Sequence, residues 1–213
     1  IKKRKANIGE AKETPSKCSE AKLTILSNKI TVLKGFAGSG KSLVAVQVGL
    51  DMLFKREIEK IIITRPLVTS GEDTGFLPGG IKEKTDPFTA PLFDNMYRLY
   101  SREKIDKEVL EGHIEIIPFA FMRGRTFENA IVLVDEAQNC TPNQMKLILS
   151  RIGENCQYVI DGDITQKDIN GQSGLEDSIR RLEHIPGIEV ITFLNQDIVR
   201  SGLCKKIIQA YSE

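Results

Sequence analysis

Residues 35–42 read GFAGSGKS and follow directly on a β-rich run, KITVLKG. The segment that comes next, KSLVAVQVGLDMLFKR, has the length of a helix and few helix breakers. A glycine-rich turn between a strand and a helix lets backbone N–H groups point at an anion, and the helix N-terminus adds the positive end of its dipole. The spacing matches G-x-x-x-x-G-K-[ST], a phosphate-binding loop. The chain is thereby restricted to folds in which strand, loop and helix surround a phosphate in this order.

Each residue type in this loop has a chemical reason. Glycines let the backbone wrap tightly around phosphate oxygens, Lys41 is expected to reach the β and γ phosphates of a nucleoside triphosphate, and the Ser42 hydroxyl is expected to ligate Mg²⁺. The predicted cofactor-binding residues are Gly35, Phe36, Ala37, Gly38, Ser39, Gly40, Lys41, Ser42 and Leu43. The alternative is a glycine-rich turn with an incidental lysine, but strand, loop and helix all occur in the required order.

The stretch IVLVDEAQN ends an apolar run with two adjacent acids. Neighbouring carboxylates repel each other unless a cation lies opposite, and here we expect Mg²⁺ and Lys41 to do so. Asp135 is predicted to hold Mg²⁺ with Ser42 from a neighbouring core strand. Glu136 is predicted to orient or deprotonate the attacking water. The alternative is an exposed strand end that leads into a turn.

A third polar stretch, IDGDITQ, also ends an apolar run. A glutamine beside the γ-phosphate can respond to its presence, as the water-orienting glutamine of GTPases does. We predict this role for Gln166. Alone, the stretch would be read as a polar turn after a strand, and the phosphate loop and the acid pair favour the catalytic interpretation.

Further apolar runs alternate with segments of helical length. The other predicted strands are IEKIIITRP, HIEIIPF, IVLVDE, CQYVIDGD and IEVITFL. Residues 65–90 are predicted to form a long loop, residues 89–111 to be mainly helical, and three later helices to start at Thr141–Pro142, at Ser173 and near Arg200. Continuous apolar strands separated by helices predict an α/β fold with a mainly parallel sheet covered on both faces. Residues 1–20 are polar and without period, so we assign them to an N-terminal arm or linker and residues 21–213 to one domain.

Composition excludes several other classes of protein. The formal net charge of the 213 residues is +1, so any nucleic-acid binding has to come from a local patch. No apolar run approaches the ~20 residues of a membrane span. The cysteines form no C-x-x-C pair, which disfavours a zinc site and favours a reducing, cytoplasmic location.

The chain resembles the PhoH family of P-loop ATPases, which is related to the first motor domain of superfamily one helicases. The shared stretches are GFAGSGKS, TRPLV, GFLPG, MRGRT, VLVDEAQN, GDITQ and DIVRSGL. The resemblance implies a three-layer RecA-like core, hydrolysis of ATP with Mg²⁺, helicase activity on RNA or single-stranded DNA, and homo-oligomers such as a hexameric ring. At one position the chain departs from the family. Relatives carry an adenine-reading glutamine at a place that falls near Cys18 here, which leaves adenine specificity open.

Two groups of residues are candidates for contacts with nucleic acid. The first consists of Thr64, Arg65, Thr69, Arg123 and Arg125. The TRP segment belongs to a loop that contacts the moving strand in related helicases, and the two arginines of MRGRT suit phosphate or carboxylate forks. For Arg65 the alternative is an ion pair with a nearby acid. The second group is the aromatic stripe Phe93, Tyr97 and Tyr100, which suits base stacking, although such a stripe more often belongs to a core.

These observations predict an Mg²⁺-dependent ATPase that acts on or near RNA or single-stranded DNA. The alternative is an ATP-driven assembly or regulatory factor that binds protein. A small-molecule kinase fits less well, because Glu136 and Gln166 suit attack by water. The chain is too short for two motor domains, so an arginine that stabilises the transition state has to come from a neighbouring subunit. Arg200 is the first candidate, since it matches the family's arginine in DIVRSG, and Arg123 and Arg125 are held in reserve. The alternative is that Arg200 pairs with an acid such as Asp197 or serves its own subunit's site.

Overall fold

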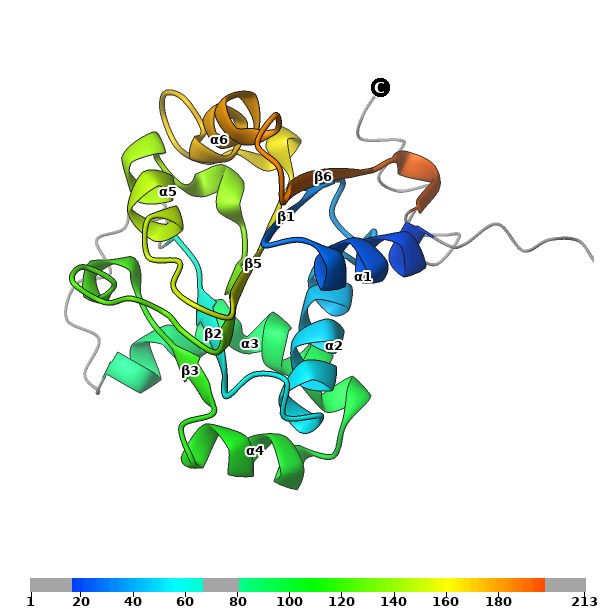
Figure 1. The fold of residues 1–213 in the computed structure, drawn as a ribbon, viewed down its shortest axis with the longest axis vertical. Coiled ribbons are helices and arrows are strands. Elements are labelled where there is room, and N and C mark those ends of the chain that lie inside the picture. The colour runs from blue at the N-terminus through cyan, green and yellow to red at the C-terminus, as the bar shows by residue number, and fades with distance from the viewer. Residues whose placement is uncertain (1–16, 67–80, 198–213) are drawn as a thin grey trace, which may run out of the picture.

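The computed structural model describes residues 17–66 and 81–197 of the chain. In this part a six-stranded sheet has the order β3-β2-β4-β5-β1-β6, and every neighbouring pair of strands is parallel (Figure 1). The strands are β1 (Ile30–Gly35), β2 (Lys60–Thr64), β3 (Ile114–Ile116), β4 (Ala130–Val134), β5 (Cys156–Gly162) and β6 (Ile188–Phe193). The helices are α1 (Lys17–Ser27), α2 (Lys41–Phe54), α3 (Ile81–Leu99), α4 (Arg102–Leu110), α5 (Pro142–Leu149) and α6 (Gly174–Leu182). Single 3-10 turns are η1 (Phe119–Phe121), η2 (Ala137–Asn139), η3 (Ile164–Gln166) and η4 (Asn195–Asp197).

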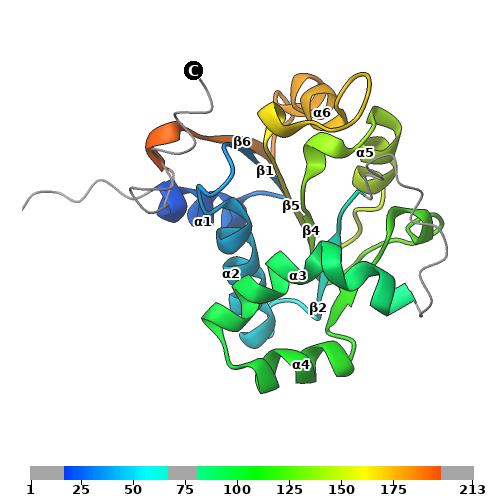
Figure 2. The same cartoon turned by 180° about the vertical axis from the view of Figure 1, so that it is seen from behind.

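Helices cover both faces of the sheet, with α1 to α4 on one side and α5 and α6 on the other (Figures 1 and 2). The packing of strand β4 explains why every one of its residues is apolar. Ile131 and Leu133 pack into the core under α1 to α4, while Val132 and Val134 pack into the core under α5 and α6. A parallel strand buried on both faces needs apolar side chains at every position. The predicted three-layer α/β core with a mainly parallel sheet is therefore confirmed.

Two boundaries differ from the sequence prediction. Helix α3 begins at Ile81, inside the segment 65–90 that its glycines and prolines marked as loop. It buries Leu92 and Met96 in the core, and this packing outweighs the local preference for a turn. Helix α1 begins at Lys17, inside the predicted arm, and anchors itself through Ala21 and Ile25. Two apolar side chains one turn apart are too weak a pattern to find in advance.

Some predictions fall elsewhere in the chain. Thr69, the GFLPG stretch, Arg200 and the helix predicted near it lie outside the described residues. Among the helices of residues 17–66 and 81–197, none is both long and apolar enough to cross a membrane.

The sheet order brings the three polar stretches together. In a parallel sheet the carboxyl ends of the strands meet at one edge, and ligands bind there. Strand β5 lies between β1 and β4, with Leu33 of β1 opposite Asp161 and Val134 of β4 opposite Ile160. The segments that follow these three strands are therefore neighbours, although they lie far apart in the sequence.

Candidate active site

The loop between β1 and α2 is shaped by two of its glycines. Gly40, the residue before α2, has φ 89°, a left-handed conformation that favours glycine. At Gly35 a side chain has no room, because a Cβ atom there would come 2.1 Å from the carbonyl oxygen of Phe193. Cys18 of α1 lies against the same loop, with its Sγ 3.4 Å from the place of a Cβ on Gly40. The loop is thus held between β6 and α1.

The side chain of Lys41 lies folded over this loop. Its Nζ donates hydrogen bonds to the carbonyl oxygens of Gly35, at 2.8 Å, and Phe36, at 2.9 Å. Burial lowers the pKa of Lys41, and the carboxylates of Asp161 and Asp163 are foremost among the groups that oppose this shift. A buried ammonium group at the start of a helix suits the role predicted for it, that of a point charge on phosphate oxygens.

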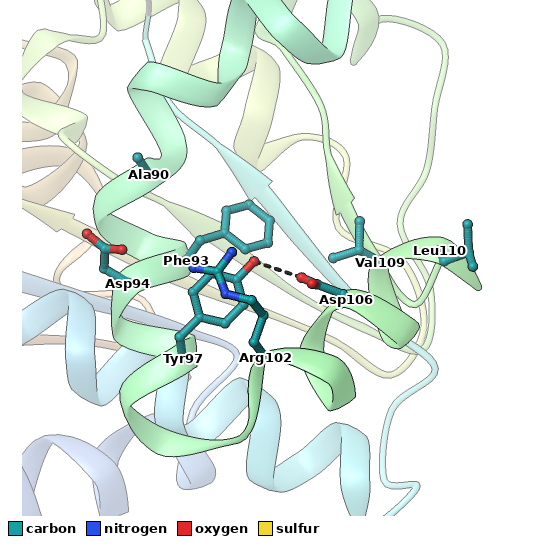
Figure 3. A pocket seen from close by; sticks show the side chains of 8 residues that line it. All are labelled: Ala90, Phe93, Asp94, Tyr97, Arg102, Asp106, Val109 and Leu110. Carbon is teal, nitrogen blue, oxygen red and sulfur yellow. Dashed lines mark hydrogen bonds between the residues drawn. The ribbon is translucent and has the colours of Figure 1, made fainter.

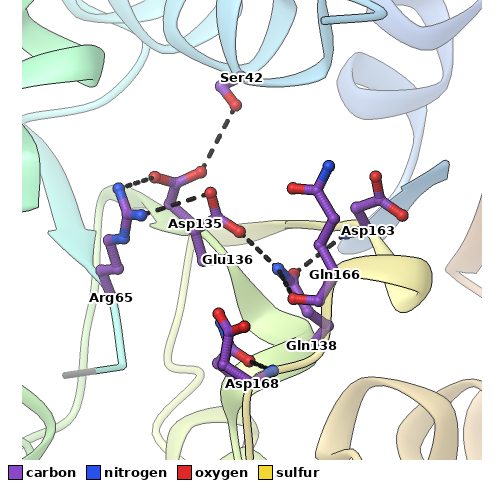
Figure 4. A network of polar contacts seen from close by, with 9 residues as sticks. Ser42, Arg65, Asp135, Glu136, Gln138, Asp163, Gln166 and Asp168 are labelled. Carbon is purple, nitrogen blue, oxygen red and sulfur yellow. Dashed lines mark hydrogen bonds and ion pairs between the residues drawn. The ribbon is translucent and has the colours of Figure 1, made fainter. Parts of the chain in front are cut away.

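Ser42 and Asp135 meet across the cleft. The Ser42 hydroxyl donates to Oδ1 of Asp135 at 3.4 Å, and the Asp135 side chain is buried (Figure 4). Two oxygen ligands at adjacent corners of an Mg²⁺ octahedron are about 3 Å apart, because each lies 2.0–2.1 Å from the ion. The hydroxyl and the carboxylate therefore fit an Mg²⁺ ion, and the metal-binding role of this pair stays a prediction.

The cation paired with the two acids is Arg65. Its guanidinium lies 3.4 Å from Oδ2 of Asp135 and 3.3 Å from Oε1 of Glu136 (Figure 4). Lys41, which we expected opposite these acids, lines the same cleft as they do, and their charges are among those that oppose the burial-lowered pKa of Lys41. Its Nζ donates to carbonyl oxygens of its own loop. Arg65 thus forms ion pairs with nearby acids, which we considered as the alternative to a contact with nucleic acid.

Glu136 is held from its other side by an amide that the sequence analysis assigned no role. The Gln138 side chain is fully buried, and its Nε2 donates to a Glu136 carboxylate oxygen and to the carbonyl of Gln166. Its Oε1 accepts from the backbone N–H of Asp163 at 3.0 Å. Glu136 itself has φ 52°, so its backbone turns sharply out of β4. In the sequence, the feature that could have indicated this contact was the amide of Gln138 two residues after Glu136.

The end of β5 carries two more acids at the cleft. Asp163 accepts from the backbone N–H of Ala37 at 2.8 Å and from the N–H and hydroxyl of Thr165. Asp161 is buried, and burial together with the carboxylate of Asp135 raises the pKa of Asp161 well above its usual range. We did not predict Asp161, although an acid inside an apolar strand was the signal. Gln166 is exposed at the rim of the same cleft.

These groups line one cleft of about 470 Å³. It brings together six of the nine residues predicted for the loop, the two acids that follow β4 and Gln166, and it adds two residues of α3 that the sequence did not indicate. The other three predicted residues, Gly35, Phe36 and Ser39, are not among the lining residues, and the buried Ser39 hydroxyl donates to the carbonyl of Phe36. The lining residues are Ala37, Gly38, Gly40, Lys41, Ser42, Leu43, Asn95, Arg98, Asp135, Glu136, Asp161, Gly162, Asp163 and Gln166. Such a mixture of backbone donors, one buried lysine and oxygen ligands suits a nucleotide's phosphates.

The other nucleic-acid candidates are scattered. Thr64 is 1% exposed, so its hydroxyl is closed to a ligand on the surface and does not fit the contact that we predicted. Arg125 is exposed but pairs with Glu115 at 3.3 Å and lies over the ring of Phe127. Arg123 is exposed.

The predicted aromatic stripe divides between two environments. Phe93 and Tyr97 line a second cavity, of about 640 Å³, between α3 and α4 (Figure 3). There the Tyr97 hydroxyl donates to Asp106 at 2.8 Å and Arg102 covers its ring. Tyr100 instead packs edge-on against Phe54. All three side chains pack against the core, which favours the structural alternative.

The amino-acid sequence is similar to those of known proteins of one family. The sequence model of the family described as PhoH-like protein matches residues 13–212. A PhoH-like protein of Synechocystis sp. is 42% identical over 190 residues, which are 88% of this chain and 58% of that protein. Protein PhoH of Escherichia coli is 41% identical over 194 residues, 88% of this chain and 54% of that protein. The Pif1 helicase of Candida albicans matches with TM-score 0.44 and 17% identity over 84% of this chain and 39% of that chain. The chain thus spans a little over half the length of these curated relatives.

Proposed function

This chain belongs to the PhoH family, and on that basis we propose that it is an Mg²⁺-dependent nucleoside triphosphatase that hydrolyses ATP. One observation carries the proposal. A single cleft collects the lysine of the phosphate loop, a hydroxyl and a carboxylate that fit Mg²⁺, and a second acid held by hydrogen bonds. In phosphoryl transfer to water the protein has to place the nucleotide, neutralise charge and orient the attacking water, and these residues supply each requirement.

We assign each residue a task within this scheme. Lys41 would leave the carbonyl oxygens of Gly35 and Phe36 to bind the β and γ phosphates. Ser42 and Asp135 would hold Mg²⁺, which supplies positive charge to the phosphate oxygens. Glu136 would accept a proton from the attacking water, and Gln166 would orient that water. Because Gln138 fixes Glu136, the base is positioned before the nucleotide arrives.

Coupling to RNA or single-stranded DNA is the second element of the proposal. It is supported by the PhoH family and by exposed arginines outside the cleft, of which Arg123 is the clearest. A homo-oligomer, for example a hexameric ring, would let a neighbouring subunit supply Arg200 to the cleft. The alternative is an ATP-driven assembly factor that binds protein.

The test is phosphate release from ATP by the purified chain, with and without single-stranded RNA or DNA. We expect release that requires Mg²⁺ and that rises when nucleic acid is added. Nucleotide binding without any release would overturn the hydrolase assignment. Release that neither nucleic acid changes would favour the assembly factor.

A further inference from the structure

A groove on the face of the molecule that α5 covers carries positive charge. It has a volume of about 490 Å³ and lies between helix α5 and the turn after η1. The lining residues are Arg123, Gly124, Asn143, Gln144, Lys146, Leu147, Ser150 and Arg151. Three of them are cations and none is an acid, and the nucleotide cleft contributes no residue to this set.

The cations of the groove differ from other surface cations in their partners. Within the described part of the chain, Arg123 and Lys146 are exposed and no acidic side chain pairs with them. By contrast, Arg180 pairs with Asp177 at 2.6 Å and Lys107 pairs with Glu111 at 3.7 Å. Unpaired cations collected in one concave surface attract an anion more strongly than cations that already have a carboxylate beside them.

Two hydrogen bonds orient the guanidinium of the third cation, Arg151. Arg151 donates from Nε to the carbonyl of Leu147 at 3.3 Å and from Nη2 to the hydroxyl of Ser150 at 3.2 Å. At the opposite wall Gly124 has φ 76°, and a Cβ atom there would meet nothing within 4 Å. A ligand can therefore approach the backbone at Gly124 closely while Arg151 holds its guanidinium in place.

We propose that this groove binds the phosphodiester backbone of single-stranded RNA or DNA, an inference that rests on the proposed coupling to nucleic acid. Phosphate oxygens in such complexes are held by Arg and Lys, by amide and hydroxyl side chains and by backbone N–H groups, which are the groups that line this groove. The lining residues include no aromatic ring on which a base stacks. Binding is therefore independent of base sequence.

The groove lies beside the segment that carries Glu136, the proposed general base. Helix α5 starts directly after the 3-10 turn that follows Glu136, and Thr141 caps it by accepting from the N–H of Gln144. In turn, the side-chain oxygen of Gln144 accepts a hydrogen bond from the backbone N–H of Thr141 at 2.8 Å. This reciprocal cap orders the first turn of α5, which only Cys140 and Thr141 separate from the 3-10 turn Ala137–Asn139. A nucleic acid in the groove thus contacts the element adjoining the proposed base.

The experiment measures binding of labelled oligo-uridine and oligo-deoxythymidine to the whole chain by fluorescence anisotropy. The test variant is Arg123→Ala/Lys146→Ala. The matched control, Arg180→Ala/Lys107→Ala, removes the same two residue types from ion-paired positions. Circular dichroism and melting temperature check that both fold. Each lost phosphate contact lowers the slope of log K against log salt by about 0.7, so the test variant should lose about 1.4 in slope and about tenfold in affinity at low salt. The control should match the unaltered chain for both oligonucleotides.

Three outcomes would overturn the proposal. The test variant binding as the unaltered chain does would remove the groove from the nucleic-acid surface. ATP hydrolysis without any oligonucleotide binding would refute the groove and leave the hydrolase standing, whereas binding without hydrolysis would refute the hydrolase alone. Polyglutamate that binds as tightly, with the same dependence on Arg123 and Lys146, would reassign the groove to acidic protein segments.

Discussion

The carboxylate of Asp163 accepts a hydrogen bond of 2.8 Å from the backbone N–H of Ala37, which lies 126 positions earlier in the chain. This bond joins the phosphate loop to the end of β5. The backbone N–H of Asp163 donates to Gln138, and Gln138 donates to Glu136 (Figure 4). The loop, the proposed base and the turn that carries Gln166 are thus parts of one hydrogen-bonded network.

We expect Gln138→Leu to slow ATP hydrolysis by at least about tenfold while nucleotide affinity stays close to normal. Leucine fills the buried space but cannot donate to Glu136 or accept from Asp163, so the base loses its fixed orientation. The measurement is kcat by steady-state phosphate release, with affinity measured separately by calorimetry.

The control for this variant is Asn139→Leu. Asn139 is also buried, and its side chain accepts from the backbone N–H of Asp168 at 2.8 Å. Its bond to Glu136 runs from its own backbone N–H to the Glu136 carbonyl oxygen at 3.0 Å, and the substitution keeps that bond. Both substitutions should lower the free energy of unfolding by about 1–3 kcal/mol, because each leaves a backbone N–H without its acceptor. Equal losses of kcat in the two variants would assign Gln138 a structural role only.

Lys41→Ala should abolish tight binding of ATP. The substitution removes the ammonium group beside the phosphate loop, and no other lysine lines the cleft within the described residues. Calorimetry with Mg²⁺ present gives the affinity. Lys167→Ala is the comparison, since that lysine donates to Gly171 at the surface nearby. An unchanged affinity in Lys41→Ala would refute the phosphate loop.

Asp135 and Glu136, the two acids that follow β4, should respond differently to loss of charge. Glu136→Gln is expected to bind ATP and to hydrolyse it at least ~10²-fold more slowly, which is the lower end of the rate loss expected when a general base is removed. Asp135→Asn is expected to weaken the Mg²⁺-dependent part of binding. Titrating Mg²⁺ at fixed ATP separates the two effects. Identical behaviour of the variants would show that our division of roles is wrong.

The sequence predicted the parts of the site that are local and left out those that depend on packing. The phosphate loop is a continuous stretch with glycines at required positions, so its fold could be read in advance. Arg98 reaches the cleft from α3, and Asp161 faces it only because β5 lies between β1 and β4. No local pattern encodes such a neighbourhood. The ion-pair partners of Arg65 could not be predicted either, because sequence spacing does not show which acid lies beside an arginine at the end of a strand.

Asp161→Asn should stabilise the protein at high pH in the absence of divalent ions. The pKa of Asp161 is raised in the folded state, so the folded chain holds this proton more tightly than the unfolded chain does. The free energy of unfolding therefore falls as pH rises from the ordinary pKa through the raised one. Asparagine has no such dependence, so the variant's advantage should grow as the pH rises above 3.8, the ordinary pKa, and vanish below it.

Urea unfolding in EDTA at several pH values measures this difference. The comparison variant is Asp94→Asn, which changes an exposed acid of α3. If the stability of Asp161→Asn relative to the unaltered chain falls as the pH rises, folding lowers the pKa of Asp161 and the shift has been assigned the wrong sign.

The last prediction separates two arginines that could neutralise the γ-phosphate. Arg98 lines the cleft of its own subunit, is exposed, and has no acidic partner among the described residues. Arg200 is proposed to enter the cleft of a neighbouring subunit, and an arginine that acts in this way contributes ~10³–10⁵ in rate.

We expect Arg200→Ala mixed with Lys41→Ala to regain part of the ATPase rate, because some sites then combine an intact Lys41 with an intact Arg200 from the neighbouring subunit. Arg98→Ala mixed with Lys41→Ala should regain nothing, since both residues serve the same subunit. Native mass spectrometry confirms that mixed oligomers have formed. No recovery in the first mixture, with mixed oligomers present, would place Arg200 in its own subunit's site or outside catalysis.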